Sequence, residues 1–211
     1  MSNIVVCWQG SYCSWDLRRI IFLIHNKSRI LSDSRSWTTK LLSAGTKFIL
    51  KKIGEEQTEL LLAHCFESNH EVIMESVDLI YHIVLLTRSI GLNSNYILKL
   101  IDIPSTWANK HNLNKLIKFS HILNYKWRTD CSLTINKELI NVPNSLTLKR
   151  LNNEILNLIM IVVKLGTKEL QNNIRLNELV VNIIYNVMGL VRDKGIEYWI
   201  ISTEIVNRTS K

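Results

Sequence analysis

The sequence predicts an all-α protein, and three observations lead to this fold class. Only two prolines and seven glycines interrupt 211 residues, which is few for a chain built from many short strands. Apolar residues recur with a helical period over long stretches. Polar breaks stand where those stretches should end. Long helices packed around a shared core are therefore expected, and the chain is long enough to bury one.

The expected helices follow one another from the N-terminus. The period places them at 16–28, 37–43, 46–65, 71–89 and 95–100. Gly91 comes just after the fourth of them, where the left-handed conformation that ends many helices favours glycine. A Pro-Ser pair follows Ile103 and makes the best linker. The boundary predicted there divides the chain into domains 1–102 and 103–211.

The second half repeats the first weakly and in the same order. Residues 183–196 align without gaps on 79–92, and 153–160 can be laid over 55–62. The acids and the histidine do not recur, since Glu59, Glu75, Asp78 and His82 correspond to Asn157, Leu179, Asn182 and Asn186. Only Glu56 keeps a carboxylate counterpart, Glu154. The pattern predicts a tandem repeat with a degenerate second copy; chance similarity between amphipathic helices is the alternative.

Charge and composition restrict the partners. The formal charge of +8 and a pI near 9.4 suit an anionic partner, but the basic residues are scattered, so a dedicated nucleic-acid binder is not predicted. The apolar runs fall short of the ~18 residues of a membrane span. Four cysteines form no CxxC pair, which is typical of free thiols in a reducing compartment. A soluble cytoplasmic protein with no membrane partner is expected.

Two carboxylate pairs of equal spacing are the most informative local feature. Glu56 and Glu59, with Glu55 beside them, precede Glu75 and Asp78. A spacing of i, i+3 puts both members of a pair on one helix face, roughly 5–6 Å apart at Cβ. Clustered carboxylate oxygens suit Mg2+, which typically also reaches the phosphates of a substrate.

The second helix argues against a merely solvated acidic surface. Residues 77–86 are apolar or aromatic except for Asp78 and His82, which share a stripe with Glu75. A helix apolar almost all round is buried, and a buried carboxylate needs a counter-charge. The acids of the preceding helix repel these carboxylates unless a cation lies between them. For Lys47 and Lys52 two interpretations remain open, phosphate binding and i, i+4 pairing with the acids.

These residues together resemble a known family. The segments that carry the resemblance are Ser36-Trp37-Thr38-Thr39-Lys40-Leu41-Leu42, Gly45-Thr46-Lys47, Lys51-Lys52-Ile53-Gly54-Glu55-Glu56 with Glu59, and Glu75-Ser76-Val77-Asp78-Leu79-Ile80-Tyr81-His82. They resemble phosphoribosyl-ATP pyrophosphohydrolase, the histidine-biosynthesis member of the MazG-like all-α pyrophosphohydrolases. The resemblance covers about residues 17–92 and implies a MazG-like helical bundle.

The resemblance also implies an activity: hydrolysis of phosphoribosyl-ATP to phosphoribosyl-AMP and pyrophosphate. It implies catalytic carboxylates at Glu55, Glu56 and Glu59, and Mg2+ ligands at Glu56, Glu59, Glu75 and Asp78. Substrate contacts are expected at Thr38, Lys40, Lys47, Lys52 and His82.

Because family members are helical homodimers, the chain is expected to form a homodimer or an intramolecular pseudo-dimer. Two alternatives remain for the function: a MazG-like hydrolase of nucleoside triphosphates or dUTP, and a non-catalytic helical scaffold or regulatory subunit.

Overall fold

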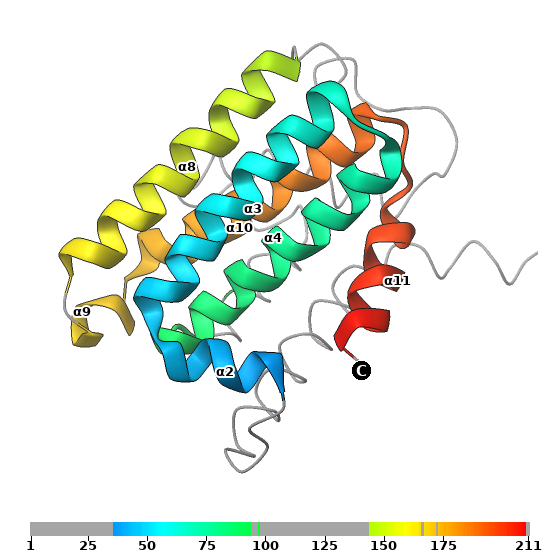
Figure 1. The fold of residues 1–211 in the computed structure, drawn as a ribbon. Coiled ribbons are helices and arrows are strands. Elements are labelled where there is room, and N and C mark those ends of the chain that lie inside the picture. Colours follow the sequence, from blue (N-terminus) through cyan, green and yellow to red (C-terminus); the bar gives the residue numbers. More distant parts are fainter. Residues whose placement is uncertain (1–35, 94–96, 98–143, 166, 172, 210–211) are drawn as a thin grey trace, which may run out of the picture.

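The described part of the chain consists of helices and short links, as the sequence predicts. The computed structural model describes residues 36–93, 97, 144–165, 167–171 and 173–209 (Figure 1). Its helices are α2 (Trp37–Ala44), α3 (Thr46–Phe66), α4 (Asn69–Ser89), α8 (Asn144–Lys164), α9 (Thr167–Gln171), α10 (Ile174–Asp193) and α11 (Tyr198–Thr209). No strand occurs in these ranges, so the all-α fold class is confirmed.

Three of the predicted helices are confirmed to within two residues, namely those at 37–43, 46–65 and 71–89. The predicted helix at 16–28 and the linker at 103–105 lie outside the described residues, and of 95–100 only residue 97 is described. The division into domains 1–102 and 103–211 therefore stays a prediction.

Local signals explain where α4 begins and ends. The Ser68 side chain accepts a hydrogen bond from the backbone N–H of Glu71 (3.4 Å), which caps the helix. At the other end Gly91 adopts a φ of +72°, a conformation that costs a residue with a Cβ atom roughly 1–2 kcal/mol. The backbone N–H of Leu92 then bonds to the carbonyl of Thr87 (2.9 Å), so the chain turns away directly after α4.

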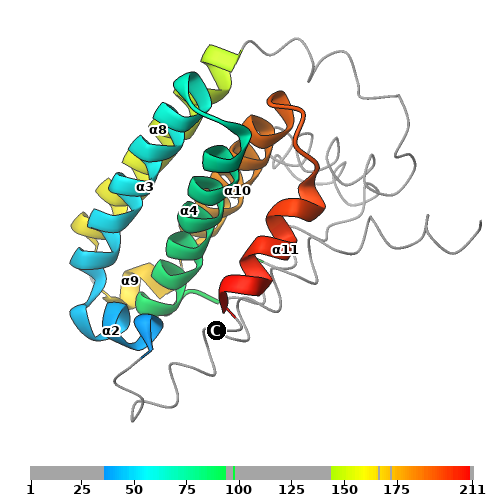
Figure 2. The same cartoon turned by 45° about the vertical axis from the view of Figure 1, so that its right-hand side comes forward.

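The helices assemble as two antiparallel pairs. The short link between α3 and α4 makes them neighbours, and α8 pairs with α10. Figure 2 shows the second pair behind the first, with α8 along α3 and α10 along α4. α11 packs on α4, and α2 crosses the end of the first pair. The shared core is built from aliphatic side chains of all four long helices, among them Ile53, Leu60, Leu79, Ile83, Leu151, Leu158, Ile183 and Leu190.

Helix α10 is both long and strongly apolar. By length and composition alone it is able to cross a membrane, but 78% of its apolar window is buried inside the bundle. This burial is what the central helix of a packed bundle requires.

Candidate metal centre

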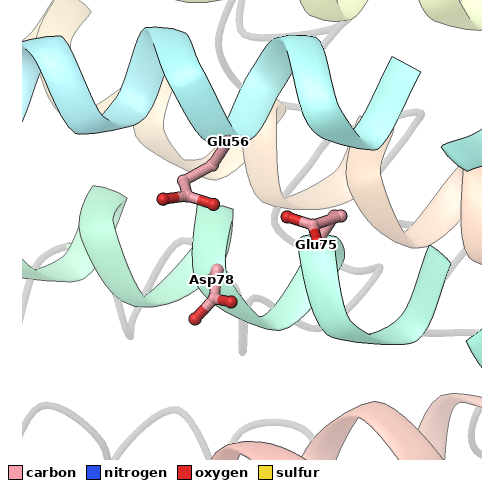
Figure 3. A group of neighbouring side chains, drawn as sticks. All are labelled: Glu56, Glu75 and Asp78. Atoms are coloured by element: carbon pink, nitrogen blue, oxygen red, sulfur yellow. The ribbon is translucent and has the colours of Figure 1, made fainter. Parts of the chain in front are cut away.

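Three carboxylates meet between α3 and α4. Glu56 projects from α3 toward α4, which carries Glu75 and Asp78 (Figure 3). One oxygen of each side chain lies within 4.8 Å of the other two. The i, i+3 spacing brings Glu75 and Asp78 to one face of α4, and the packing of α3 on α4 adds Glu56 from the facing helix.

The electrostatics of this group show a shortage of positive charge. Glu56 is buried, while Glu75 and Asp78 are half-buried. Burial first, and then the neighbouring charges of Glu59, Glu56 and Asp78, together raise the pKa of Glu75 to about 7. A carboxyl that resists ionisation among like charges is stabilised in its charged form when a cation joins the group.

The donor set fits a hard divalent cation. All three ligands are carboxylates, which suit Mg2+ or Mn2+ better than softer metals. Adjacent oxygens around Mg2+ lie about 3 Å apart and opposite ones about 4.2 Å. The three carboxylates, whose oxygens lie within 4.8 Å of one another, must therefore draw closer to share one ion.

Glu59, predicted as a ligand, lies beside this group rather than within it. Its side chain is exposed. Three causes raise the pKa of Glu59: partial desolvation is the largest, and the charge of Glu56 and a side-chain hydrogen bond with Glu56 come next. The structure thus places Glu59 next to Glu56 but on the solvent side of the three-carboxylate group.

Lys52 bridges two of the predicted catalytic acids. Its Nζ lies 2.9 Å from Glu55 Oε2 and 2.9 Å from Glu56 Oε1. These contacts, the hydrogen bond with Glu55 first, raise the pKa of Lys52. Glu55 also pairs with Lys51 (3.2 Å), and its hydrogen bonds with the two lysines lower its pKa. The i, i+4 pairing expected for Lys52 is therefore present, together with an i, i+3 contact to Glu55, and Glu55 faces the lysines.

His82 is buried against the acid group in its neutral form. Its Nδ1 donates to the backbone carbonyl of Asp78 (2.8 Å) and lies 3.8 Å from Glu56 Oε1. Burial lowers the pKa of His82, so the contact with Glu56 is not an ion pair at neutral pH. Its other ring nitrogen, Nε2, is buried and has no hydrogen-bond partner among the described residues.

The remaining predicted substrate contacts lie further along the molecule. Thr38 on α2 is buried and its Oγ1 lies 2.8 Å from the hydroxyl of Tyr81, one turn beyond Asp78 on α4. Lys40 and Lys47 are both exposed, one on α2 and one in the first turn of α3. Thr38 thus contacts α4, the helix that carries Glu75 and Asp78, whereas Lys40 and Lys47 lie at the surface.

Tyr81 is a residue that the sequence reasoning left without a role. Its hydroxyl fastens α2 to α4 through Thr38, and a second contact, between Thr46 Oγ1 and Ser89 Oγ (2.8 Å), fastens the start of α3 to the end of α4. The signal for Tyr81 was its position three residues after Asp78, which places both on neighbouring turns of one face.

The comparisons with known proteins agree with this geometry. A sequence model of the family described as "Phosphoribosyl-ATP pyrophosphohydrolase" matches residues 23–102, which include α2, α3, α4 and the three carboxylates. A "Phosphoribosyl-ATP pyrophosphatase" of Pyrobaculum aerophilum is 37% identical over 70 residues, which cover 33% of this chain and 74% of that protein. This chain belongs to the phosphoribosyl-ATP pyrophosphohydrolase family. A second "Phosphoribosyl-ATP pyrophosphatase", from Dechloromonas aromatica, is 39% identical over 77 residues, 34% of this chain and 71% of the relative.

Longer family relatives are matched over only part of their length. The "Histidine biosynthesis bifunctional protein HisIE" of Buchnera aphidicola is 39% identical over 83 residues, 39% of this chain and 40% of that protein. The chain thus spans less than half the length of the bifunctional relatives that it matches. No solved structure matches the chain significantly. The family likeness rests on the region of α2, α3 and α4.

Proposed function

We propose that this chain hydrolyses phosphoribosyl-ATP between its α- and β-phosphates, giving phosphoribosyl-AMP and pyrophosphate in a Mg2+-dependent reaction of histidine biosynthesis. The observation that carries the proposal is the group of three carboxylates, Glu56, Glu75 and Asp78, within 4.8 Å of one another. This group lies inside the region that matches the family.

Glu56, Glu75 and Asp78 are the residues that would hold Mg2+, and Glu59 lies beside them, hydrogen-bonded to Glu56. A bound Mg2+ supplies polarisation of the phosphate oxygens and a lowered pKa for the attacking water. The buried position of Glu56 fixes the group on α3. On α4, the hydrogen bond from His82 to the Asp78 carbonyl holds the imidazole ring against Glu56.

Of the two acids flanking Glu56, Glu59 is better suited to accept the proton of the attacking water. A general base works best when its pKa lies near the working pH, and the pKa of Glu59 is raised. Glu55 has the opposite shift, since hydrogen bonds with Lys52 and Lys51 lower its pKa. Glu55 then acts through Lys52, whose position it helps to set.

Lysines supply the positive charge that a pyrophosphate leaving group requires. Lys52 is already at the edge of the carboxylate group through its contact with Glu56. Lys40 and Lys47, both exposed near the junction of α2 and α3, extend this positive charge toward solvent. Thr38 and the unpartnered Nε2 of His82 complete the proposed substrate contacts.

The proposal includes a small-molecule substrate and a cytoplasmic location, without a nucleic-acid or membrane partner. Scattered basic charge and the absence of a CxxC pair support it. Cys65, a cysteine within the described ranges, is an exposed free thiol.

The decisive test measures pyrophosphate release by the full chain from phosphoribosyl-ATP, beside ATP and dUTP, with Mg2+ and with EDTA. Glu59→Ala is compared with Glu67→Ala, because Glu67 is equally exposed but lies beyond the end of α3. A preference for phosphoribosyl-ATP that is lost only in Glu59→Ala supports the assignment. Turnover of ATP or dUTP instead indicates a MazG-like nucleotide hydrolase, and no turnover of any substrate indicates a scaffold.

A further inference from the structure

The two helix pairs of the bundle correspond residue by residue. α3 and α8 both have 21 residues, and one constant offset carries Thr46 to Asn144 and Phe66 to Lys164. The same offset carries the fully buried Ile53 and Leu60 onto Leu151 and Leu158, which are also fully buried.

α4 and α10 correspond in the same way, through a second constant offset. Buried side chains coincide along the whole helix, so that Val72, Val77, Leu79, Ile83 and Leu86 correspond to Leu176, Val181, Ile183, Val187 and Leu190. Matching helix ends follow. Gly91 and Gly195 have φ values of +72° and +71°. The next residue bonds back to the carbonyl of Thr87 in one case and of Val191 in the other. The longer connection of the second pair contains α9.

The carboxylate group of the first pair has a changed counterpart in the second. Glu154 stands at the position of Glu56, and its Oε2 accepts a hydrogen bond from Asn186 Nδ2 (2.8 Å). Asn186 stands at the position of His82, which approaches Glu56 in the first pair. The positions of Glu75 and Asp78 hold Leu179 and Asn182, so no second carboxylate faces Glu154 from α10.

We propose that α8 and α10 are a second copy of α3 and α4, in which a Glu154–Asn186 hydrogen bond has replaced the metal centre. The second copy packs against the first as the second subunit of a symmetric dimer would. The described helices accordingly form an intramolecular pseudo-dimer with one metal centre.

The contacts between the two pairs support this arrangement. α3 packs on its own counterpart α8, and α4 packs on its own counterpart α10 (Figure 2). A two-fold interface has this property, because the same surface of each copy meets its equivalent in the other. This order adds to the buried positions that match residue by residue between the two pairs.

The environment of Glu154 agrees with a position that binds no metal. Burial raises its pKa to about 7, which the hydrogen bond from Asn186 and the charge of Arg150 only partly oppose. A single carboxyl that is held by a neutral amide and has no like charge beside it needs no cation. Glu56 lies among two further carboxylates instead.

Glu56→Gln and Glu154→Gln form a matched pair for the test, since they make the same change at corresponding positions. Mn2+ binding to the full chain is followed by isothermal titration and by the rise in melting temperature that Mn2+ causes. We expect Glu56→Gln to weaken Mn2+ binding at least tenfold and Glu154→Gln to leave stoichiometry and affinity unchanged. Loss of Mn2+ binding in Glu154→Gln overturns the proposal. So does a Glu56→Gln variant that keeps half of the wild-type Mn2+ sites and loses them when Glu154→Gln is added.

Two further measurements keep the proposal open to refutation. Restoring the acids in the second copy, with Asn157→Glu, Leu179→Glu and Asn182→Asp together, is expected to add a Mn2+ site to the wild-type number. If this variant does not fold, sedimentation velocity of the wild-type chain decides. A monomer is expected at micromolar concentration, and a chain found only as a dimer of full chains contradicts the pseudo-dimer.

Discussion

Glu75→Gln is expected to stabilise the metal-free protein above neutral pH and to abolish its stabilisation by Mg2+. In the metal-free state Glu75 is desolvated and surrounded by the charges of Glu59, Glu56 and Asp78. The neutral amide of glutamine has nearly the same shape and experiences no such repulsion. The substitution therefore removes a proposed Mg2+ ligand and, with it, a negative charge that destabilises the metal-free fold.

The size of the effect follows from the pKa of Glu75, which rises from 4.5 to about 7. A difference of about 2.5 units corresponds to about 3.4 kcal/mol of unfolding free energy at 1.36 kcal/mol per unit. Glu75 is only half-buried, so solvent screening reduces the expected effect to about 1–2 kcal/mol.

The raised pKa of Glu75 makes the wild-type protein less stable as the pH rises. Below the unfolded-state pKa of 4.5 the carboxyl is protonated in both states and costs nothing. Between pH 4.5 and about 7 the unfolded chain ionises while the folded protein resists, so the wild-type protein loses stability as the pH rises. Above about pH 7 the loss is complete, and there Glu75→Gln gains most.

Urea unfolding at pH 5 and pH 8 in EDTA tests this reasoning, with Glu67→Gln as an exposed control. We expect Glu75→Gln to exceed the wild type at pH 8 by about 1–2 kcal/mol and to approach it at pH 5. Mg2+ at one hundred times its Kd should add about 2.7 kcal/mol to the wild type and little to the variant. A variant less stable than the wild type at pH 8 in EDTA would refute the repulsion argument. An equal Mg2+ effect in both proteins would remove Glu75 from the ligand set.

Two further predictions concern the framework around the centre. Tyr81→Phe and Thr38→Val each remove the same 2.8 Å hydrogen bond, so each should lower the free energy of unfolding by about 1 kcal/mol, and in urea the double variant should lose no more than either. Gly91→Ala should cost at least about 1 kcal/mol, because φ is +72° and the new Cβ would lie 2.8 Å from Gln171 Nε2. Gly54→Ala, in the interior of α3 with nothing within 4 Å of its Cβ, should raise stability by about 0.5–1 kcal/mol. Calorimetry checks this pair, and the reverse ranking would contradict the conformational argument.

The acid motifs illustrate the reach and the limit of reasoning from spacing. The i, i+3 rule placed Glu75 and Asp78 on one face of α4, and the structure agrees. On α3 the same rule treated Glu56 and Glu59 alike, yet Glu56 is buried and Glu59 is exposed. Residues three apart on a helix differ by about 60° around its axis. Glu59 therefore lies at the edge of the buried face that Ile53, Glu56 and Leu60 form. Which of two neighbouring acids enters the interface depends on how α3 is rotated against α4.

The structure gives Lys52 and Lys47 different surroundings, which spacing leaves open. Lys52 contacts both Glu55 and Glu56, because it is one turn away from each and side chains on a helix lean toward its N-terminus, which carries the acids toward Lys52. Lys47 is one turn further away and stays exposed. The sequence offered the same two interpretations for both residues, and only the side-chain positions show that Lys52 pairs with the acids while Lys47 is exposed.

The sequence by itself determined the helical class, the positions of α2, α3 and α4, and the acids that form the candidate centre. It did so because helical period, caps and i, i+3 spacing are local properties, set within one or two turns of the chain. The tertiary structure decided that α3 meets α8 and α4 meets α10. It also decided that Glu56, and not Glu59, lies with Glu75 and Asp78. These outcomes depend on the rotation and pairing of whole helices, which the fit of many side chains across an interface selects and no short stretch of sequence encodes.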